Sequence, residues 1–150
     1  MTGANFSSWY NQSEGSLYAD MARFGTSAAF PALVANDGTD GNAIRVFVWG
    51  GSNTPGSQVV VGGVEQQSAA TAAVGAGVFA KSILGYKAND FGFSSNGSAA
   101  SLDTSGVLPL VTQLLIGQRV AGPTYLNGYV RKLSFYPKRL TNAQLQAITG

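Results

Sequence analysis

Three features of the sequence predict an all-β fold, a two-sheet antiparallel β-sandwich that ends in a short C-terminal helix. Apolar and polar residues alternate with a period of two over many short segments, as in half-buried strands. Clusters of Gly, Asn, Asp, Ser and Pro separate these segments about every ten residues. No helical periodicity interrupts them before the C-terminal end. This combination favours a sandwich or jelly roll over a parallel α/β fold.

The expected strands follow one another with turns between them. The clearest covers residues 43–49, Ala-Ile-Arg-Val-Phe-Val-Trp, and a loop over 50–56 joins it to a return strand over 58–61, so we expect a hairpin. Asn96-Gly97 is a strong signal for another hairpin turn. Further strands are expected over residues 16–24, 29–35, 78–86, 90–95, 112–116 and 126–136, with a turn over 36–42, an alanine-rich loop holding one strand or helical turn over 65–77, and a loop over 98–109.

The C-terminal helix is predicted from its capping residues. Pro137 ends the last strand, and Thr141 has the features of an N-cap with Gln144 as its capping-box partner. The short helix that follows is expected to pack Leu145 and Ile148 against the sandwich.

The composition limits the functions that this chain can perform. Its 150 residues suit one domain, and the absence of Cys and His excludes disulfides, cysteine-ligated metals and the commonest general base. Charged residues make up 11% of the chain and the net charge is +2, which speaks against nucleic acid as a partner. No apolar run is long enough for a membrane helix, so no membrane insertion is expected. The basic residues Arg131, Lys132, Lys138 and Arg139 are expected to form a solvated face.

Several motifs, taken in order, resemble a known family. Val130-Arg-Lys-Leu133 leads into Phe135-Tyr-Pro137 and then Leu140-Thr-Asn-Ala-Gln-Leu145, while Asn96-Gly97, Leu115-Ile-Gly117 and Leu126-Asn-Gly128 precede them. This order resembles the laminin-G-like, concanavalin A-like jelly roll. The opening Asn5-Phe-Ser-Ser-Trp-Tyr-Asn11, with Glu14-Gly15, is similar to the version of this module at the C-terminal end of phage virion proteins of the tail or fibre.

The resemblance extends from about Asn5 to Ile148 and implies a particular setting. It implies that residues 1–150 form a single jelly-roll domain, consistent with a fragment of a longer virion protein. It also implies a place on the phage particle or its tail. Modules of this kind either recognise a glycan or protein ligand or serve as structural parts of a larger particle.

Catalysis is tested by the positions of the acidic residues. Glycosidases of the concanavalin-like fold need two carboxylates flanking the bond, and acids on one strand face are spaced i, i+2 or i, i+4. No strand here carries that spacing, nor does the chain have a Glu-x-Asp-x-x-Glu strand. A pair such as Glu14 and Asp90 could form only by folding. Lys81-Ser82 are adjacent and are expected on opposite faces of a strand, so we expect no enzyme.

A metal site is a weaker alternative. Asp37 and Asp40 lie in a loop rich in Gly and Asn and could share a calcium ion with backbone carbonyls. The loop lacks the acidic residue that an EF-hand requires at its end. A hairpin turn with local hydrogen bonds explains the same residues, so no cofactor is expected unless calcium is bound here.

Sugar recognition needs an aromatic face beside planar polar groups. Three groups of residues combine the two: Trp9, Tyr10 and Asn11; Trp49 and Asn53; and Tyr125 and Asn127. Each aromatic could instead belong to the core, with Trp9 as a packing anchor, while Tyr125 follows a Gly-Pro-Thr loop and is expected to be exposed.

The strand over residues 43–49 is apolar on both faces. Phe47 and Trp49 share one face with Arg45, which suits a buried strand or an oligomer interface. We therefore expect a non-catalytic, lectin-like module of a virion protein, a homo-oligomer that contacts a host-surface glycan or protein, or other virion proteins. The alternative is a structural domain for assembly, oligomerisation or decoration of the capsid or tail, without glycan binding.

Overall fold

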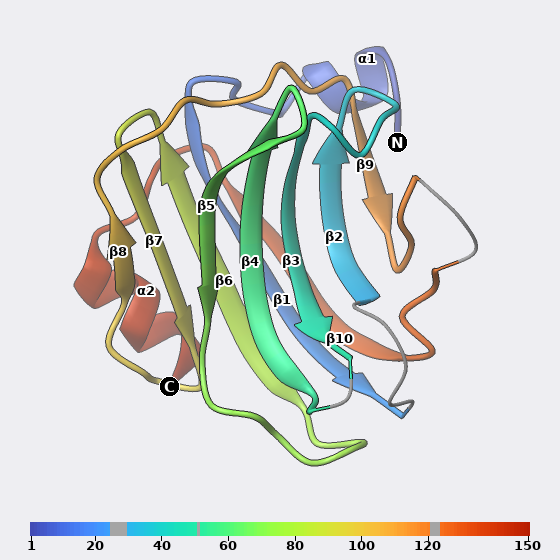
Figure 1. Cartoon of the computed structure of the whole chain (residues 1–150), viewed down its shortest axis with the longest axis vertical. Coiled ribbons are helices and arrows are strands. Elements are labelled where there is room, and N and C mark those ends of the chain that lie inside the picture. Colours follow the sequence, from blue (N-terminus) through green and yellow to red (C-terminus); the bar gives the residue numbers. More distant parts are fainter. Residues whose placement is uncertain (25–29, 51, 121–123) are drawn as a thin grey trace.

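The computed structural model describes residues 1–24, 30–50, 52–120 and 124–150, and it consists of two antiparallel five-stranded sheets packed face to face (Figure 1). Sheet A has the strand order β5-β4-β3-β2-β9, and sheet B has the order β10-β1-β6-β7-β8. The predicted fold class is confirmed. The elements of sheet A are β2 (Phe30–Asn36), β3 (Ala43–Trp49), β4 (Thr54–Val61), β5 (Val64–Ala70) and β9 (Gln113–Ile116). Those of sheet B are β1 (Glu14–Arg23), β6 (Ala80–Lys87), β7 (Asp90–Ser95), β8 (Ser101–Asp103) and β10 (Gly128–Tyr136). The helices are α1 (Ala4–Ser7) and α2 (Asn142–Thr149).

The core lies between the two sheets and follows from the alternation along their strands. Leu17 and Met21 of β1 face Ile44 and Val46 of β3, and all four side chains are buried in one apolar cluster. Complete burial of such a side chain contributes about 1.5–3 kcal/mol to folding. Because consecutive side chains point to opposite faces, each strand also presents a second set outward, and these outward sets build the sites below.

The two predicted hairpins are confirmed, and the first is longer than expected. Strand β4 begins at Thr54, so residues expected in the loop pair with β3, and Pro55 lies opposite Val48. Asn96 and Gly97 both have positive φ, 49° and 74°, and form a tight turn. The turn is closed by the bond from Ser98 N to Ser95 O at 3.0 Å.

The alanine-rich stretch was expected to hold one strand or helical turn, and it holds a strand, β5, which pairs with β4. Two other local predictions were incomplete. The expected loop over 98–109 contains the short strand β8. The single-turn helix α1 was not predicted, since four residues carry no helical periodicity; its Phe6 is buried in the core. The strand expected over 29–35 is β2, and residue 29 lies outside the described residues.

Helix α2 packs on the outer face of sheet B. The predicted capping box is confirmed, because Thr141 Oγ1 accepts from Gln144 N and the Gln144 side chain accepts from Thr141 N. Leu145 is buried against Tyr18 and Ile83, and Ile148 is partly buried against the same cluster. None of the described helices is long and apolar enough to cross a membrane.

Arg139 is a correction to the expected solvated face of basic residues. Its side chain is only 5% exposed and lies across two glycines that pair between β6 and β7, Gly85 and Gly92. A Cβ at Gly85 would lie 2.9 Å from Arg139 Cδ, and one at Gly92 would lie 2.6 Å from Nη2. Both positions need glycine because the arginine occupies the space above them.

Candidate functional site

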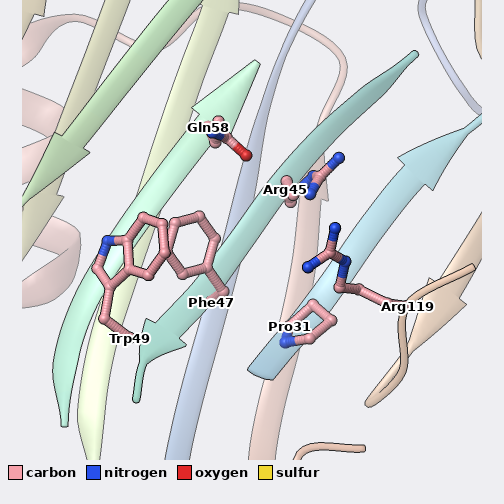
Figure 2. A pocket seen from close by; sticks show the side chains of 6 residues that line it. All are labelled: Pro31, Arg45, Phe47, Trp49, Gln58 and Arg119. Carbon is pink, nitrogen blue, oxygen red and sulfur yellow. The ribbon is translucent and has the colours of Figure 1, made fainter. Parts of the chain in front are cut away.

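A cavity of about 200 Å³ opens on the outer face of sheet A, and we call it the sheet A cavity. The neighbouring strands β2, β3 and β4 supply most of its walls, and the segment after β9 supplies the rest. Figure 2 shows two aromatic rings gathered on one side and two guanidinium groups on the other. The lining residues are Pro31, Arg45, Phe47, Trp49, Gln58 and Arg119.

The aromatic wall is formed by Phe47 and Trp49, which lie two residues apart on β3 and so share a face. Their rings meet edge to face with centroids 4.6 Å apart. Phe47 is buried, whereas Trp49 is 38% exposed, so the indole is the accessible part of this wall. Strand β4 makes room for both rings at Gly56, where a Cβ would lie 3.0 Å from Phe47 Cε2 and from Trp49 Nε1.

The cationic wall is formed by Arg45 and Arg119, joined through one carboxylate. Asp40, in the turn between β2 and β3, accepts from Arg119 Nε at 3.2 Å and lies 3.0 Å from its Nη2. Arg45 Nη2 donates to the backbone oxygen of Asp40 at 2.7 Å and lies 3.8 Å from its carboxylate. Two positive groups therefore share a single negative one at the edge of the cavity.

The electrostatics of this wall leave capacity for an anion. Burial lowers the pKa of Arg45, Asp40 opposes that shift, and the nearby charge of Arg119 adds to it. The guanidinium remains charged at neutral pH because its ordinary pKa is so high. Arg45 Nε is buried and has no hydrogen-bond partner among the described residues, although the side chain lines the cavity. The accessible guanidinium of this wall is that of Arg119, whose side chain is 34% exposed, and it can donate to a bound carboxylate or hydroxyl.

Polar groups complete the floor and rim. Gln58 lies directly opposite Arg45 on β4, and its Nε2 donates to Glu65, which leaves the side-chain oxygen as a hydrogen-bond acceptor beside the cavity. Arg119 is fixed by its backbone, since its N–H donates to Thr124 O at 3.2 Å. The site thus combines donors, an acceptor and a flat apolar surface.

Among the residues predicted to bind ligand, Trp49 lies in this cavity. Asn53 is buried beneath the sheet end, where its Oδ1 accepts from Arg23 at 3.4 Å. Tyr125 is 57% exposed in the segment that follows β9, and Asn127 has φ 43° and accepts from Phe24 N through its backbone oxygen. The structure does not bring these three to the sheet A cavity.

The predicted N-terminal group lies in another part of the molecule. Tyr10 is 8% exposed and stacks on Phe6 and Phe135, so its ring belongs to the core. Trp9 is partly buried against the same core and donates through Nε1 to Asn5 O. Asn11 donates to Pro137 O and accepts from Ser13 N, which stabilises the entry into β1.

The acids of the predicted calcium loop have different partners. Asp37 accepts from Thr39 N, Thr39 Oγ1 and Asn42 Nδ2, and the two side-chain bonds are the main cause that lowers its pKa. Asp40 instead faces the two arginines. Within the described ranges no three His, Cys, Asp or Glu side chains come together as a metal site.

The carboxylates of Glu14 and Asp90 do approach one region, as considered for catalysis, and Arg139 lies between them. Glu14 Oε2 accepts from Arg139 N at 3.0 Å, and Asp90 Oδ1 pairs with Arg139 Nη2 at 3.0 Å. Both carboxylates are therefore engaged by Arg139, one by its backbone and one by its side chain.

Sequence reasoning missed four contributors to the cavity. Arg119 is brought in by tertiary structure from a segment without a distinctive pattern, and Gln58 could be found only from the register of β3 with β4. Pro31 and Gly56 lie opposite Phe47 on its two sides. The alternation of Arg45, Phe47 and Trp49 was the one signal in the sequence.

No family model matches the chain, and no curated protein matches it by sequence. Solved structures do match. The CBM40 module of the Ruminococcus gnavus IT-sialidase bound to α2,3 sialyllactose superposes with a TM-score of 0.77 and 16% identity, over 96% of this chain and 86% of that chain. A leech intramolecular trans-sialidase superposes with a TM-score of 0.75 and 14% identity, over 93% of this chain and 24% of that chain.

A third similar structure is the heptameric SAP-like pentraxin from Limulus polyphemus, with a TM-score of 0.65 and 13% identity, over 91% of this chain and 70% of that chain. At such identities the similarity establishes a shared jelly-roll sandwich fold. The residues of the cavity must carry any statement about the ligand.

Proposed function

We propose that this chain is a non-catalytic carbohydrate-binding module of a phage virion protein, and that it binds an acidic glycan of the host surface in the sheet A cavity. The observation that carries this proposal is the pair Arg45 and Arg119, which share Asp40 beside the accessible ring of Trp49. The R. gnavus module, which has the same fold and is bound to a sialyllactose, supports an acidic sugar as the ligand class.

In the proposed mode, the sugar carboxylate accepts hydrogen bonds from the guanidinium groups of Arg45 and Arg119. Guanidinium matches a carboxylate in shape and charge, and such bonds are stronger than neutral ones. The apolar C–H side of a sugar ring packs on Trp49, and Gln58 accepts from a hydroxyl. The site needs no metal ion in this arrangement.

The phage setting rests on the resemblance of the two ends of the sequence to virion modules. A shallow cavity of this size gives weak binding to a single sugar, and repetition of the module on a particle would raise avidity by about 10²–10⁴. We therefore expect the module to act as one of several copies in a homo-oligomer.

The test is titration of the purified chain with 3′-sialyllactose, with lactose as the uncharged comparator, followed by amide NMR shifts and calorimetry. We expect saturable binding of 3′-sialyllactose with shifts around Arg45 and Trp49, and binding of lactose at least about tenfold weaker. Arg119→Ala should weaken binding about 10- to 100-fold, because a hydrogen bond to a charged group contributes about 1.5–3 kcal/mol.

Lys138→Ala is the matched control, since it removes one exposed positive charge far from the cavity. Equal affinity for both sugars, or binding that survives Arg119→Ala, would contradict the assigned site. No binding by the folded protein displayed multivalently on a glycan array would favour the structural alternative.

One observation favours that alternative, a role in virion assembly without glycan binding. A second cavity of about 240 Å³ opens between the edges β9 and β10, and its lining is almost entirely apolar. Ile116 and Met1 at its rim are about half exposed. Mass measurement in solution separates the two roles, because a clean monomer that binds sialyllactose weakens the assembly role.

A further inference from the structure

On the outer face of sheet B, the carboxylate of Asp20 lies among basic side chains but forms no bond with them. Its Oδ1 is buried without a hydrogen-bond partner in the part of the chain that the structure describes. No ion pair between described residues includes Asp20. It nevertheless lies directly opposite Lys81 on β6 and Lys132 on β10.

The surrounding cations are each engaged elsewhere. Lys81 Nζ donates to Gly150 O at 2.6 Å, and Lys132 Nζ lies 5.8 Å from the ring centre of Tyr18. The guanidinium carbon of Arg131 lies 3.3 Å from the ring centre of Phe79. A buried carboxylate oxygen without a partner is costly, so its persistence beside three cations calls for an explanation.

The backbone supports a built site at this position. The pairing of β1 with β10 shifts register next to Asp20, which pairs with Lys132, while Met21 pairs with Val130. Arg131 is the extra residue of this bulge. Bulges redirect side chains and are common beside functional sites. Here the bulge coincides with the placement of Arg131 against Phe79.

A cavity of about 310 Å³ lies between these groups, at the end of α2 and beside the hairpin turn after β7. Asn96 also lines it, and because its Oδ1 accepts from Lys81 N, its Nδ2 is the atom that can donate to a ligand. The cavity therefore offers oxygen acceptors at Asp20, Thr149 and Gly150, and donors from Lys81, Asn96 and Arg131. Its volume is at the lower end of the range for small-molecule sites.

We propose that this cavity is a second saccharide site, in which adjacent hydroxyls of a neutral sugar bridge Asp20 to Lys81 and Asn96. A hydroxyl donates one hydrogen bond and accepts two, so it can give its proton to Asp20 while it accepts from the ammonium or the amide. A cationic ligand would be repelled by Lys81, Arg131 and Lys132, and a simple anion would be repelled by the Asp20 carboxylate. A neutral polyhydroxyl ligand satisfies both kinds of group.

The site lies on the sheet opposite to the sheet A cavity, so the chain would hold two glycans on its two outer faces. This inference stands independently of the proposed acidic-glycan site. Binding at one face is not required for binding at the other.

The test is an amide NMR titration of the whole chain with the methyl glycosides of glucose, galactose, mannose and N-acetylglucosamine, taken to high millimolar concentration. At least one glycoside should give saturable shifts at Lys81, Asn96 and Arg131. Asp20→Ala should weaken this binding at least tenfold, and Asp20→Asn should weaken it severalfold because the oxygen acceptor remains. Both variants should fold as stably as the parent, since the replaced oxygen has no partner to lose.

Asp103→Ala is the matched control, an acid on β8 of the same sheet whose Oδ1 accepts from Ser105 N and Ser105 Oγ in its own loop. It should leave the shifts unchanged. Absence of shifts at these three amides with all four glycosides would overturn the proposal, as would shifts that persist in Asp20→Ala. Shifts with glycine or inorganic phosphate alone would also overturn it, and would assign the cavity to a zwitterion or an anion. The amides of Arg45 and Trp49 report on the sheet A cavity in the same spectra, so failure of either site is seen separately.

Discussion

The two sheets each hold an arginine of low exposure on their outer face, and the surroundings of these arginines differ. On sheet B, Arg139 meets two acids: Asp90 pairs with its guanidinium and Glu14 accepts from its backbone N–H. Its Nη1 and Nη2 donate to Leu140 O and Asn142 Oδ1, its Nε is buried without a hydrogen-bond partner among the described residues, and its stem fills the space over the paired glycines. On sheet A, two arginines share the single acid Asp40 beside an open cavity.

The difference lies in the balance of charges and in access. Around Arg139 the acids match or exceed the base and helix α2 covers the face, so the arrangement is closed and holds the fold together. Around Arg45 and Arg119 two bases face one acid, and both line a cavity on this face. Figure 2 shows their guanidinium groups beside each other. Exposure does not separate the two arginines, because Arg45 is 7% exposed and the Arg139 side chain is 5% exposed. The balance of acids and bases therefore distinguishes the two regions, whereas burial does not.

The largest expected effect is on the closed side. Arg139→Ala should destabilise the fold by about 3 kcal/mol, because it empties the buried space beneath α2 and removes the hydrogen bonds to Leu140 O and Asn142 Oδ1. Urea unfolding measures the change, with exposed Lys138→Ala as the control that should stay within about 0.5 kcal/mol. Affinity for 3′-sialyllactose should be unchanged in material that remains folded. A variant as stable as the parent would remove the contrast between the two arginines.

The next effect concerns the shared acid. Asp40→Ala should lower the free energy of unfolding by about 1–3 kcal/mol, because two neighbouring guanidinium groups lose their common counterion. Added sulfate should restore part of the loss, while the parent should respond less. Thermal unfolding across a sulfate series measures this, with Asp103→Ala as an acid that faces no arginine. Equal responses of the two variants would show that Asp40 does not hold the pair.

The aromatic wall can be displaced without removing any polar group. Gly56→Ala should weaken sialyllactose binding about tenfold and destabilise the fold by about 1 kcal/mol, since the added methyl meets Phe47 and Trp49 at 3.0 Å. Gly41→Ala is the control, because its Cβ would have only ordinary contacts from 3.5 Å outward. Calorimetric titration and tryptophan fluorescence report affinity and ring displacement. Unchanged fluorescence and affinity would exclude the aromatic wall from the site.

The smallest effect is expected for the second acid of the same turn. Hydrogen bonds from Thr39 and Asn42 lower the pKa of Asp37 in the folded protein. The ionised carboxylate therefore stabilises the fold above about pH 4, the ordinary pKa of an aspartate, and this stabilisation is lost as the pH falls through the lower pKa of the folded state. Asp37→Asn should cost at most about 1 kcal/mol at neutral pH and should flatten the loss of stability in acid. Urea midpoints from pH 7 down to about pH 2.5 measure this. Sugar binding should not change, in contrast to changes at the arginine wall.

The sequence alone predicts those parts of the fold that depend on local chemistry. Asn96-Gly97 specifies its turn because both residues tolerate positive φ, and Thr141 with Gln144 specifies the start of α2. For β5 the sequence left a strand and a helical turn open, because it is an edge strand with mostly polar and small residues, and its order comes from pairing with β4. For the cavity, alternation placed Arg45, Phe47 and Trp49 on one face, but Arg119 joins Asp40 from 79 positions away. Contacts across such distances leave no local pattern.

The position of β1 between β6 and β10 has a consequence for the order in which the chain folds during synthesis. Strand β1 emerges early, yet Ser16 pairs with Tyr136, near the far end of the chain. Closing so long a loop is slow, while residues are added at only about 5–20 per second. Pairing with β6 becomes available sooner, so β10 should join last and seal an edge that is open until then. A translational pause before residue 128 would hold the unsealed sheet in the state most prone to aggregate.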